Sequence, residues 1–173
     1  LMGARGGASG EGGPARGRPG GRAFTSGKKT LRHRHFTVWR DDKQVRAKED
    51  ILTNLDTRAE QVVDARGAAR WSGAEADPRP HIACGHIPGS ANVPFTALYN
   101  ADGTFKDKAA LKAAFEEAGV DLSKPVVTSC GSGVTACVLL FALHLLGKED
   151  TALYDGSWTE WGADPETPKG LAV

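Results

Sequence analysis

The segment from Cys130 to Thr135 is the most informative chemical feature of this sequence. It reads Cys-Gly-Ser-Gly-Val-Thr and lies between an apolar strand-like segment, residues 125–129, and a long apolar helix-like segment, residues 136–146. A cysteine between a strand and a helix, followed by a glycine-containing turn, has several backbone N–H groups and the positive helix end near its sulfur. These groups stabilise a thiolate, so the sequence predicts a nucleophilic cysteine in an anion-binding loop.

Length and composition predict one folded domain preceded by a polar segment. A chain of 173 residues suits a single globular domain with a tail. The 22 Lys and Arg residues nearly balance the 21 Asp and Glu residues, so neither nucleic acid nor a membrane surface is expected as a partner. The longest apolar run, residues 134–146, is too short to span a bilayer.

Cysteine usage indicates a reducing compartment. The three cysteines, Cys84, Cys130 and Cys137, cannot all pair with one another, and one of them is expected to react as a thiolate. We therefore expect a cytoplasmic protein, with mitochondria as the alternative. The spacing of His81, Cys84 and His86 is compatible with zinc, but no fourth ligand is apparent and no metal is expected.

Residues 1–35 are predicted to be a Gly- and Arg-rich disordered tail or linker. Nine of the first 22 residues are glycine, and this composition cannot form a core. An RNA-binding arm and a transit peptide are the alternatives. A solvated linker is favoured because no aromatic residue precedes Phe24 and no apolar targeting core is present.

Residues 36–173 are predicted to form an α/β domain, because strand-like and helix-like segments alternate along them. The expected strands are residues 36–39, 61–64, 92–94, 125–129 and 152–154, and the expected helices are residues 47–55, 67–73, 107–118 and 134–146. Such alternation is typical of a parallel sheet, whose active site lies at the carboxyl ends of the strands. Asp64 and Cys130 both fall at that edge.

Four motifs occur in the order found in one known family. They are residues 62–66 (VVDAR), 85–94 (GHIPGSANVP), 130–135 (CGSGVT) and 154–161 (YDGSWTEW). On these motifs the segment from about residue 36 to residue 171 resembles the rhodanese family, specifically the carboxy-terminal catalytic domain of 3-mercaptopyruvate sulfurtransferases. The resemblance implies a five-stranded parallel sheet flanked by helices on both faces, no cofactor, and a persulfide carried on Cys130.

The resemblance also implies roles for side chains outside the loop. Arg70 and Arg79 match family positions that bind the carboxylate of the sulfur donor, and a guanidinium group has the fork geometry for that contact. Ordinary ion pairs are the alternative for both arginines. Asp64 is expected to support the site by hydrogen bonding to loop amides, and His86 is expected to support it from the Gly-His-Ile-Pro-Gly-Ser turn.

The loop composition favours one sulfur donor over another. Thiosulfate-using relatives place an arginine and a lysine where this chain has Gly131 and Ser132, so a neutral loop favours 3-mercaptopyruvate.

Related cysteine-dependent phosphatases need an arginine at the end of the loop. Ala136 and Cys137 stand there instead, which argues against phosphate ester hydrolysis, and Cys137 is expected to pack in the core.

The expected reaction starts with attack of the Cys130 thiolate on the sulfur of the donor. The amides from Gly131 to Thr135, including those of Gly133 and Val134, would surround the resulting persulfide. The Ser132 and Thr135 hydroxyls are placed to hydrogen-bond the sulfur or to help move a proton. Thioredoxin, glutathione or cyanide would then accept the sulfur.

Two other functions are compatible with the motifs. A thiosulfate sulfurtransferase would use the same cysteine, and a persulfide-carrier module would be loaded by a partner protein. Two-domain members of the family cover this site with an amino-terminal rhodanese-like domain. Residues 1–35 cannot form such a domain, so two alternatives are expected: a chain whose amino-terminal rhodanese-like domain is missing, or a single-domain enzyme with an open site.

Overall fold

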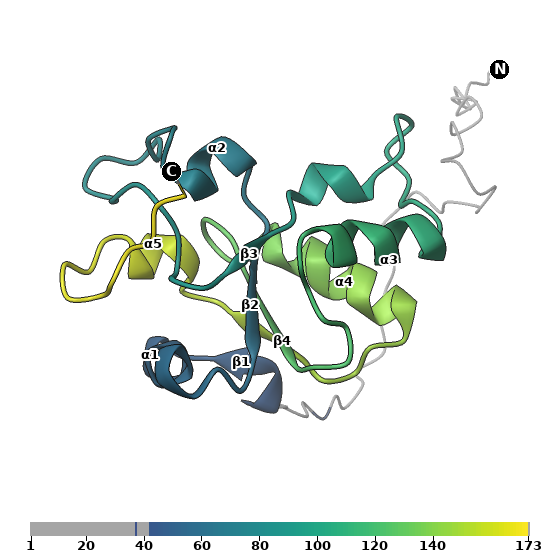
Figure 1. Cartoon of the computed structure of the whole chain (residues 1–173), viewed down its shortest axis with the longest axis horizontal. Helices are drawn as coiled ribbons and strands as arrows, with labels where there is room; N and C mark the ends of the chain where they lie inside the picture. Colours follow the sequence, from purple (N-terminus) through teal and green to yellow (C-terminus); the bar gives the residue numbers. More distant parts are fainter. Residues whose placement is uncertain (1–36, 38–41, 173) are drawn as a thin grey trace, which may run out of the picture. The chain divides into compact units, whose positions relative to one another are not determined.

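Five parallel strands form the centre of the computed structural model, which describes residue 37 and residues 42–172 (Figure 1). In spatial order they run β1-β5-β4-β2-β3. The strands are β1 (Val45–Arg46), β2 (Gln61–Asp64), β3 (Ala91–Asn92), β4 (Val126–Ser129) and β5 (Thr151–Tyr154). The predicted parallel α/β sheet is thereby confirmed.

Two predicted segments lie outside the described residues. They are the tail, residues 1–35, and the strand expected at residues 36–39, of which the structure describes residue 37 alone. The described residues 42–172 belong to one compact unit, and everything below refers to it. Its first strand, β1, is only two residues long, which is too short for the sequence pattern to reveal.

Helices cover both faces of the sheet, as predicted (Figure 1). The α-helices are α1 (Lys48–Thr57), α2 (Ala68–Ser72), α3 (Lys108–Glu117), α4 (Ala136–Leu146) and α5 (Ser157–Trp161). Two 3₁₀ turns, η1 (Asp42–Gln44) and η2 (Phe95–Leu98), complete the described elements. The first four α-helices correspond to predicted segments, whereas α5 was not predicted.

Alternate residues of the central strands divide the core into two layers, because successive strand side chains point to opposite faces. Val63 and Val126 pack in the layer formed with α3 and α4. Val62 and Val127 pack in the layer formed with α1 and α5. Each layer therefore fixes one face of the strands that lead to the site.

The register of the strands brings several polar residues to one edge. Asp64, the last residue of β2, is paired with Ser129 at the end of β4 and with Asn92 at the end of β3. The next residue after β4 is Cys130. The carboxyl ends of the three strands thus meet at the edge where the sequence predicted the site.

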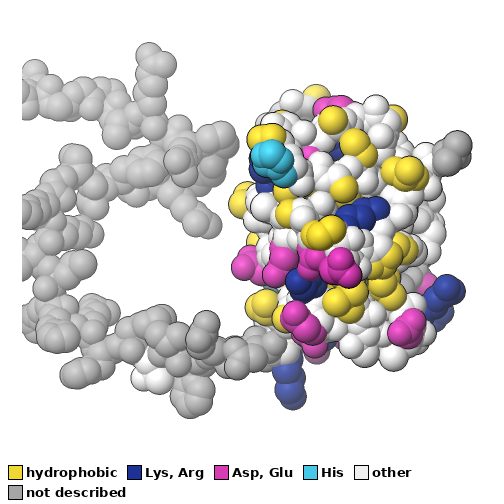
Figure 2. Space-filling view, turned by 90° about the vertical axis from the view of Figure 1, so that its left-hand side faces the viewer, with side chains coloured by type: hydrophobic (Ala, Val, Ile, Leu, Met, Phe, Trp, Pro, Cys, Tyr) yellow, Lys and Arg dark blue, Asp and Glu magenta, His cyan; other side chains and the backbone are white. Residues whose placement is uncertain are grey.

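The face that carries α1 and α5 has a mixed charge (Figure 2). Acidic side chains form a band there beside basic and apolar ones (Figure 2). Lys48, the first residue of α1, forms an ion pair of 2.7 Å with Asp164, which follows α5. This contact joins α1 to the segment that follows α5, on the same face of the sheet. In the part of the chain that the structure describes, no helix has the length and apolar character needed to cross a membrane.

Leu139 offers a test of the packing on α4. Its side chain is fully buried between α4 and the sheet, so Leu139→Ala is expected to lower the free energy of unfolding by about 2 to 5 kcal/mol. Leu52 on α1 is 36% exposed, and Leu52→Ala should change that free energy by roughly 0.5 kcal/mol. Urea denaturation of both variants measures the difference. Equal losses would contradict the assigned core.

Candidate active site

The loop of residues 130–135 is held in place by the first residues of α5. The backbone N–H of Cys130 donates to Ser157 Oγ at 3.1 Å, and the backbone N–H of Trp158 donates to the Cys130 carbonyl at 2.9 Å. The Thr159 N–H donates to the carbonyl of Gly131 at 2.9 Å. Ser157 is itself fixed by donating to the Tyr154 carbonyl at 2.9 Å. Three successive residues therefore position the backbone around Cys130.

The sulfur of Cys130 lies in a site that favours the thiolate. Burial of this residue, which is only 1% exposed, acts to raise the pKa of the thiol. The hydroxyl of Thr135 and the backbone N–H groups of Ser132, Thr135 and Ala136 donate hydrogen bonds to the sulfur and outweigh burial. The pKa of Cys130 is consequently below its ordinary value.

The two predicted loop hydroxyls differ in their surroundings. That of Thr135 contacts the sulfur, whereas Ser132 contributes its backbone N–H and its side chain is exposed. Val134 projects from the loop and is 73% exposed. Gly133 has a φ of +82°, and a Cβ there would come within 3.0 Å of Asp155. A side chain at position 133 would therefore strain the turn and also collide with the segment after β5.

Asp64 is buried and paired with an arginine that was not predicted to be important. The Arg66 guanidinium donates to both carboxylate oxygens of Asp64, at 2.7 to 3.1 Å, and the Arg66 backbone N–H donates to Oδ1 at 2.9 Å. The guanidinium also donates to the Gly85 carbonyl at 2.8 Å and lies 4.5 Å from the ring centroid of Trp158. The expected hydrogen bonding of Asp64 to a loop amide is thus present at Arg66.

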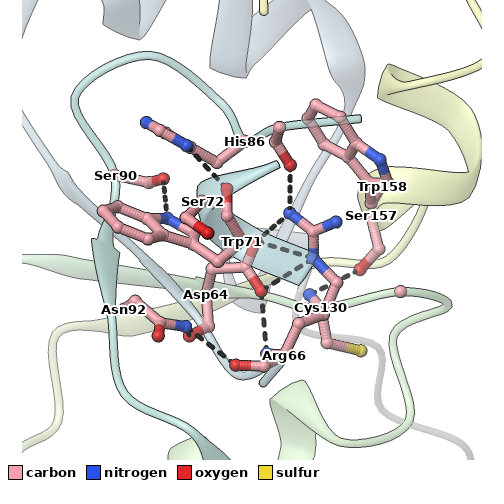
Figure 3. Close-up of polar contacts among 12 residues, drawn as sticks. Asp64, Arg66, Trp71, Ser72, His86, Ser90, Asn92, Cys130, Ser157 and Trp158 are labelled. Carbon is pink, nitrogen blue, oxygen red and sulfur yellow. Dashed lines mark hydrogen bonds and ion pairs between the residues drawn. The ribbon is translucent and has the colours of Figure 1, made fainter. Parts of the chain in front are cut away.

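This pair connects the strand edge to α5, because Trp158 also donates its backbone N–H to Cys130. In Figure 3 the guanidinium of Arg66 lies between Asp64 and Trp158, and the sulfur of Cys130 points away from the pair. Asp64 therefore lies on the side of Cys130 away from its sulfur. Its position suits the predicted structural role better than that of a general base acting on a donor.

His86 joins α2 to the carboxy-terminal segment. Its Nδ1 lies 2.8 Å from the carbonyl oxygen of Trp71, and its ring stacks on the Trp71 ring with centroids 4.2 Å apart (Figure 3). The His86 backbone exchanges two hydrogen bonds with Gly170, at 2.9 and 2.8 Å. That these contacts support catalysis stays a prediction.

The two predicted donor-binding arginines are placed differently. Arg79 lies against the loop of residues 130–135, where its Nη1 donates to the hydroxyl of Thr159 and is 3.4 Å from the Gly131 carbonyl. It is also paired with Asp77, at 2.8 Å from Nε. Arg70 is on α2 and has neither an ion pair nor a hydrogen-bonded side chain among the described residues. Its part in donor binding stays a prediction.

The other cysteines lie outside the core. Cys84 and Cys137 are both exposed free thiols, and the expectation that Cys137 packs in the core was wrong. The buried residues of α4, which include Ala136, Leu139 and Leu143, take the face toward the sheet, and Cys137 does not share it. The described residues contain no group of three or more His, Cys, Asp and Glu side chains suited to hold a metal ion.

Comparison with known proteins agrees with this architecture. The family model of the rhodanese-like domain matches residues 47–164, which is more than half of the chain. The chain belongs to the rhodanese family. This rhodanese-like domain is 48% identical over 145 residues to the 3-mercaptopyruvate sulfurtransferase of Mus musculus, covering 83% of this chain and 49% of that protein.

Two further relatives show the range of the family. A protein of Arabidopsis thaliana named thiosulfate/3-mercaptopyruvate sulfurtransferase 1, mitochondrial, is 42% identical over 120 residues, or 69% of this chain and 32% of its own length. The crystal structure of SseA from Escherichia coli, a 3-mercaptopyruvate sulfotransferase with the rhodanese fold, is 40% identical with a TM-score of 0.61. That match covers 72% of this chain and 45% of SseA. The chain spans about half or less of the length of these relatives.

Thr135 provides a test of the thiolate environment. Thr135→Val removes the hydroxyl that bonds the sulfur, so the pKa of Cys130 should rise, and alkylation by iodoacetamide should reach half its maximal rate at a higher pH. The measurement is the rate of alkylation against pH in a Cys84→Ser, Cys137→Ser background, with Thr135→Ser as the control that keeps the hydroxyl. An unshifted pH profile for Thr135→Val would show that the Thr135 hydroxyl does not lower the pKa of Cys130.

Proposed function

We propose that this rhodanese-like domain is a sulfurtransferase that moves sulfur from 3-mercaptopyruvate to a thiol or to cyanide through a persulfide on Cys130. The observation that carries the proposal is the sulfur of Cys130, whose pKa is lowered by donors from its own loop. The similarity to 3-mercaptopyruvate sulfurtransferases over most of the chain supports the choice of donor.

The first half-reaction forms the persulfide. The Cys130 thiolate attacks the thiol sulfur of 3-mercaptopyruvate, a sulfur–sulfur bond forms, and the electrons of the broken carbon–sulfur bond pass to the carbon as the enolate of pyruvate. The proton of the donor thiol then moves to that carbon, so that pyruvate leaves and the persulfide is anionic. The amides of Ser132, Thr135 and Ala136 surround the sulfur and suit the negative charge.

The second half-reaction transfers the outer sulfur. An acceptor thiolate attacks it and expels Cys130 as a thiolate, which the same hydrogen bonds stabilise. Glutathione, thioredoxin and cyanide are the proposed acceptors. A second rhodanese-like domain is a further proposed partner, since the longer relatives extend beyond the matched region.

A reducing compartment, the cytoplasm or the mitochondrion, is the proposed location. Cys84, Cys130 and Cys137 are all free thiols in the structure, and a persulfide cycle requires a reduced nucleophile. The Arabidopsis thaliana relative is named as mitochondrial.

Mass spectrometry of the intact protein tests the proposed cycle. Incubation with 3-mercaptopyruvate should add one sulfur atom to the wild-type chain and release pyruvate. Cys130→Ser should abolish the added mass, because the other thiols lack the loop amides, whereas Cys84→Ser and Cys137→Ser should retain it. Persulfide that persists in Cys130→Ser would overturn the assignment.

Thiosulfate is the alternative donor, and the loop composition allows a test of donor preference. Gly131→Arg with Ser132→Lys introduces cations beside the nucleophile, and a Cβ at position 131 would lie 3.1 Å from Nη2 of Arg79. The double variant should therefore raise the ratio of thiosulfate to 3-mercaptopyruvate kcat/KM. General damage to the loop would lower both rates and leave the ratio near its starting value. An unchanged ratio, or a wild-type preference for thiosulfate, would favour thiosulfate sulfurtransferase activity.

A further inference from the structure

Asp77 is a buried carboxylate that the proposed reaction does not use directly. Its side chain is 2% exposed, and it contacts Arg79 through both oxygens. Oδ1 accepts from the Arg79 backbone N–H at 3.0 Å and from Nε at 2.8 Å, and Oδ2 accepts from Nη2 at 3.0 Å. This two-point contact lowers the pKa of Asp77, because the guanidinium bonds the ionised carboxylate.

The contact determines which edge of the Arg79 guanidinium faces the nucleophilic loop. Asp77 occupies the edge formed by Nε and Nη2. The terminal nitrogens then lie at the loop, with Nη1 3.4 Å from the Gly131 carbonyl and Nη2 3.1 Å from where a Cβ of residue 131 would be. The Thr159 hydroxyl accepts from Nη1 and donates to the same carbonyl.

Arg79 needs such support because of its exposure. Its side chain is 36% exposed, and a long, partly solvated side chain loses rotamer freedom when it must bind a ligand in one orientation. A partner that is already buried holds the guanidinium in that orientation before the donor arrives. Gly131 has no side chain, and this leaves room for Nη2 of Arg79 beside the loop.

We infer that Asp77 is a positioning residue for the sulfur donor, which fixes Arg79 so that its terminal nitrogens receive the carboxylate of a 2-oxo acid beside Cys130. The inference rests on the proposed function. Asp77 acts through Arg79 and does not touch the reacting atoms.

Asp77→Asn tests this arrangement with little change in shape. The amide keeps an oxygen for the Arg79 backbone N–H and Nε, but it turns an NH₂ group toward Nη2 and so displaces the guanidinium. We expect kcat/KM for 3-mercaptopyruvate to fall about tenfold, mainly through a higher KM. Mercaptoacetone has the same reactive group and a methyl group in place of the carboxylate. The Asp77→Asn variant should therefore convert mercaptoacetone at the same rate as the wild-type protein does.

Three comparisons make the test specific. Asp77→Asn should cause no further loss in an Arg79→Ala background, because the two residues act as one unit. Asp150→Asn is the matched control, since Asp150 pairs with Lys148 at 2.6 Å just before β5, at the opposite edge of the sheet; it should leave both donors unaffected. If Asp77→Asn lowers the thermal transition, Asp77→Glu is used instead, and its longer side chain should raise the KM for 3-mercaptopyruvate alone.

The results separate this inference from the proposed function. A wild-type chain that does not convert 3-mercaptopyruvate defeats the proposed function itself. If Arg79→Ala is impaired but Asp77→Asn retains or exceeds the wild-type kcat/KM, only the positioning role of Asp77 is overturned. Equal losses with 3-mercaptopyruvate and mercaptoacetone also overturn it, because they indicate general damage to the site.

Discussion

Burial of the Cys130 sulfur opposes its ionisation, and the rest of the site is arranged around that constraint. The opposing hydrogen bonds come from the Thr135 hydroxyl and from the amides of Ser132, Thr135 and Ala136, which have this orientation only while the loop keeps its shape. The loop keeps its shape because Ser157, Trp158 and Thr159 bond its backbone from α5. Ionisation of one sulfur thus depends on contacts between segments nearly 30 residues apart in the sequence.

The same edge of the sheet contains a second buried charge that is fully paired. Arg66 and Asp64 are both nearly inaccessible, and removing one partner from such a pair leaves an uncompensated charge in the interior. The Trp158 ring covers the guanidinium and donates its indole N–H to the Ala83 carbonyl at 2.8 Å. The pair therefore links β2, the segment that carries Arg79, and α5.

Local patterns in the sequence predicted the features that depend on neighbouring residues. The strand before Cys130, the helix after it and the parallel sheet all follow from periodicity and from the strand–loop–helix order. The roles of Arg66, Asp77 and Ser157 were missed, because each depends on a tertiary contact. Arg66 and Ser157 lie inside motifs that were recognised, so the motif pattern marked their positions without indicating their partners. The prediction for Cys137 was wrong because α4 itself has apolar residues on most of its sides. The periodicity of its sequence therefore indicates the buried face only weakly.

The order of synthesis determines when the contacts between α5 and the Cys130 loop can form. Ribosomes extend a chain from its amino terminus, and domains fold as units once their segments have emerged. Residues 157–159 follow Cys130 by about one helix and one strand, and they are the last described elements to appear. A nascent chain that has emerged only through α4 contains the cysteine and its helix but not the residues that hold its loop. Cys130 therefore acquires the contacts that hold its loop only when the carboxy-terminal part of the domain has been made.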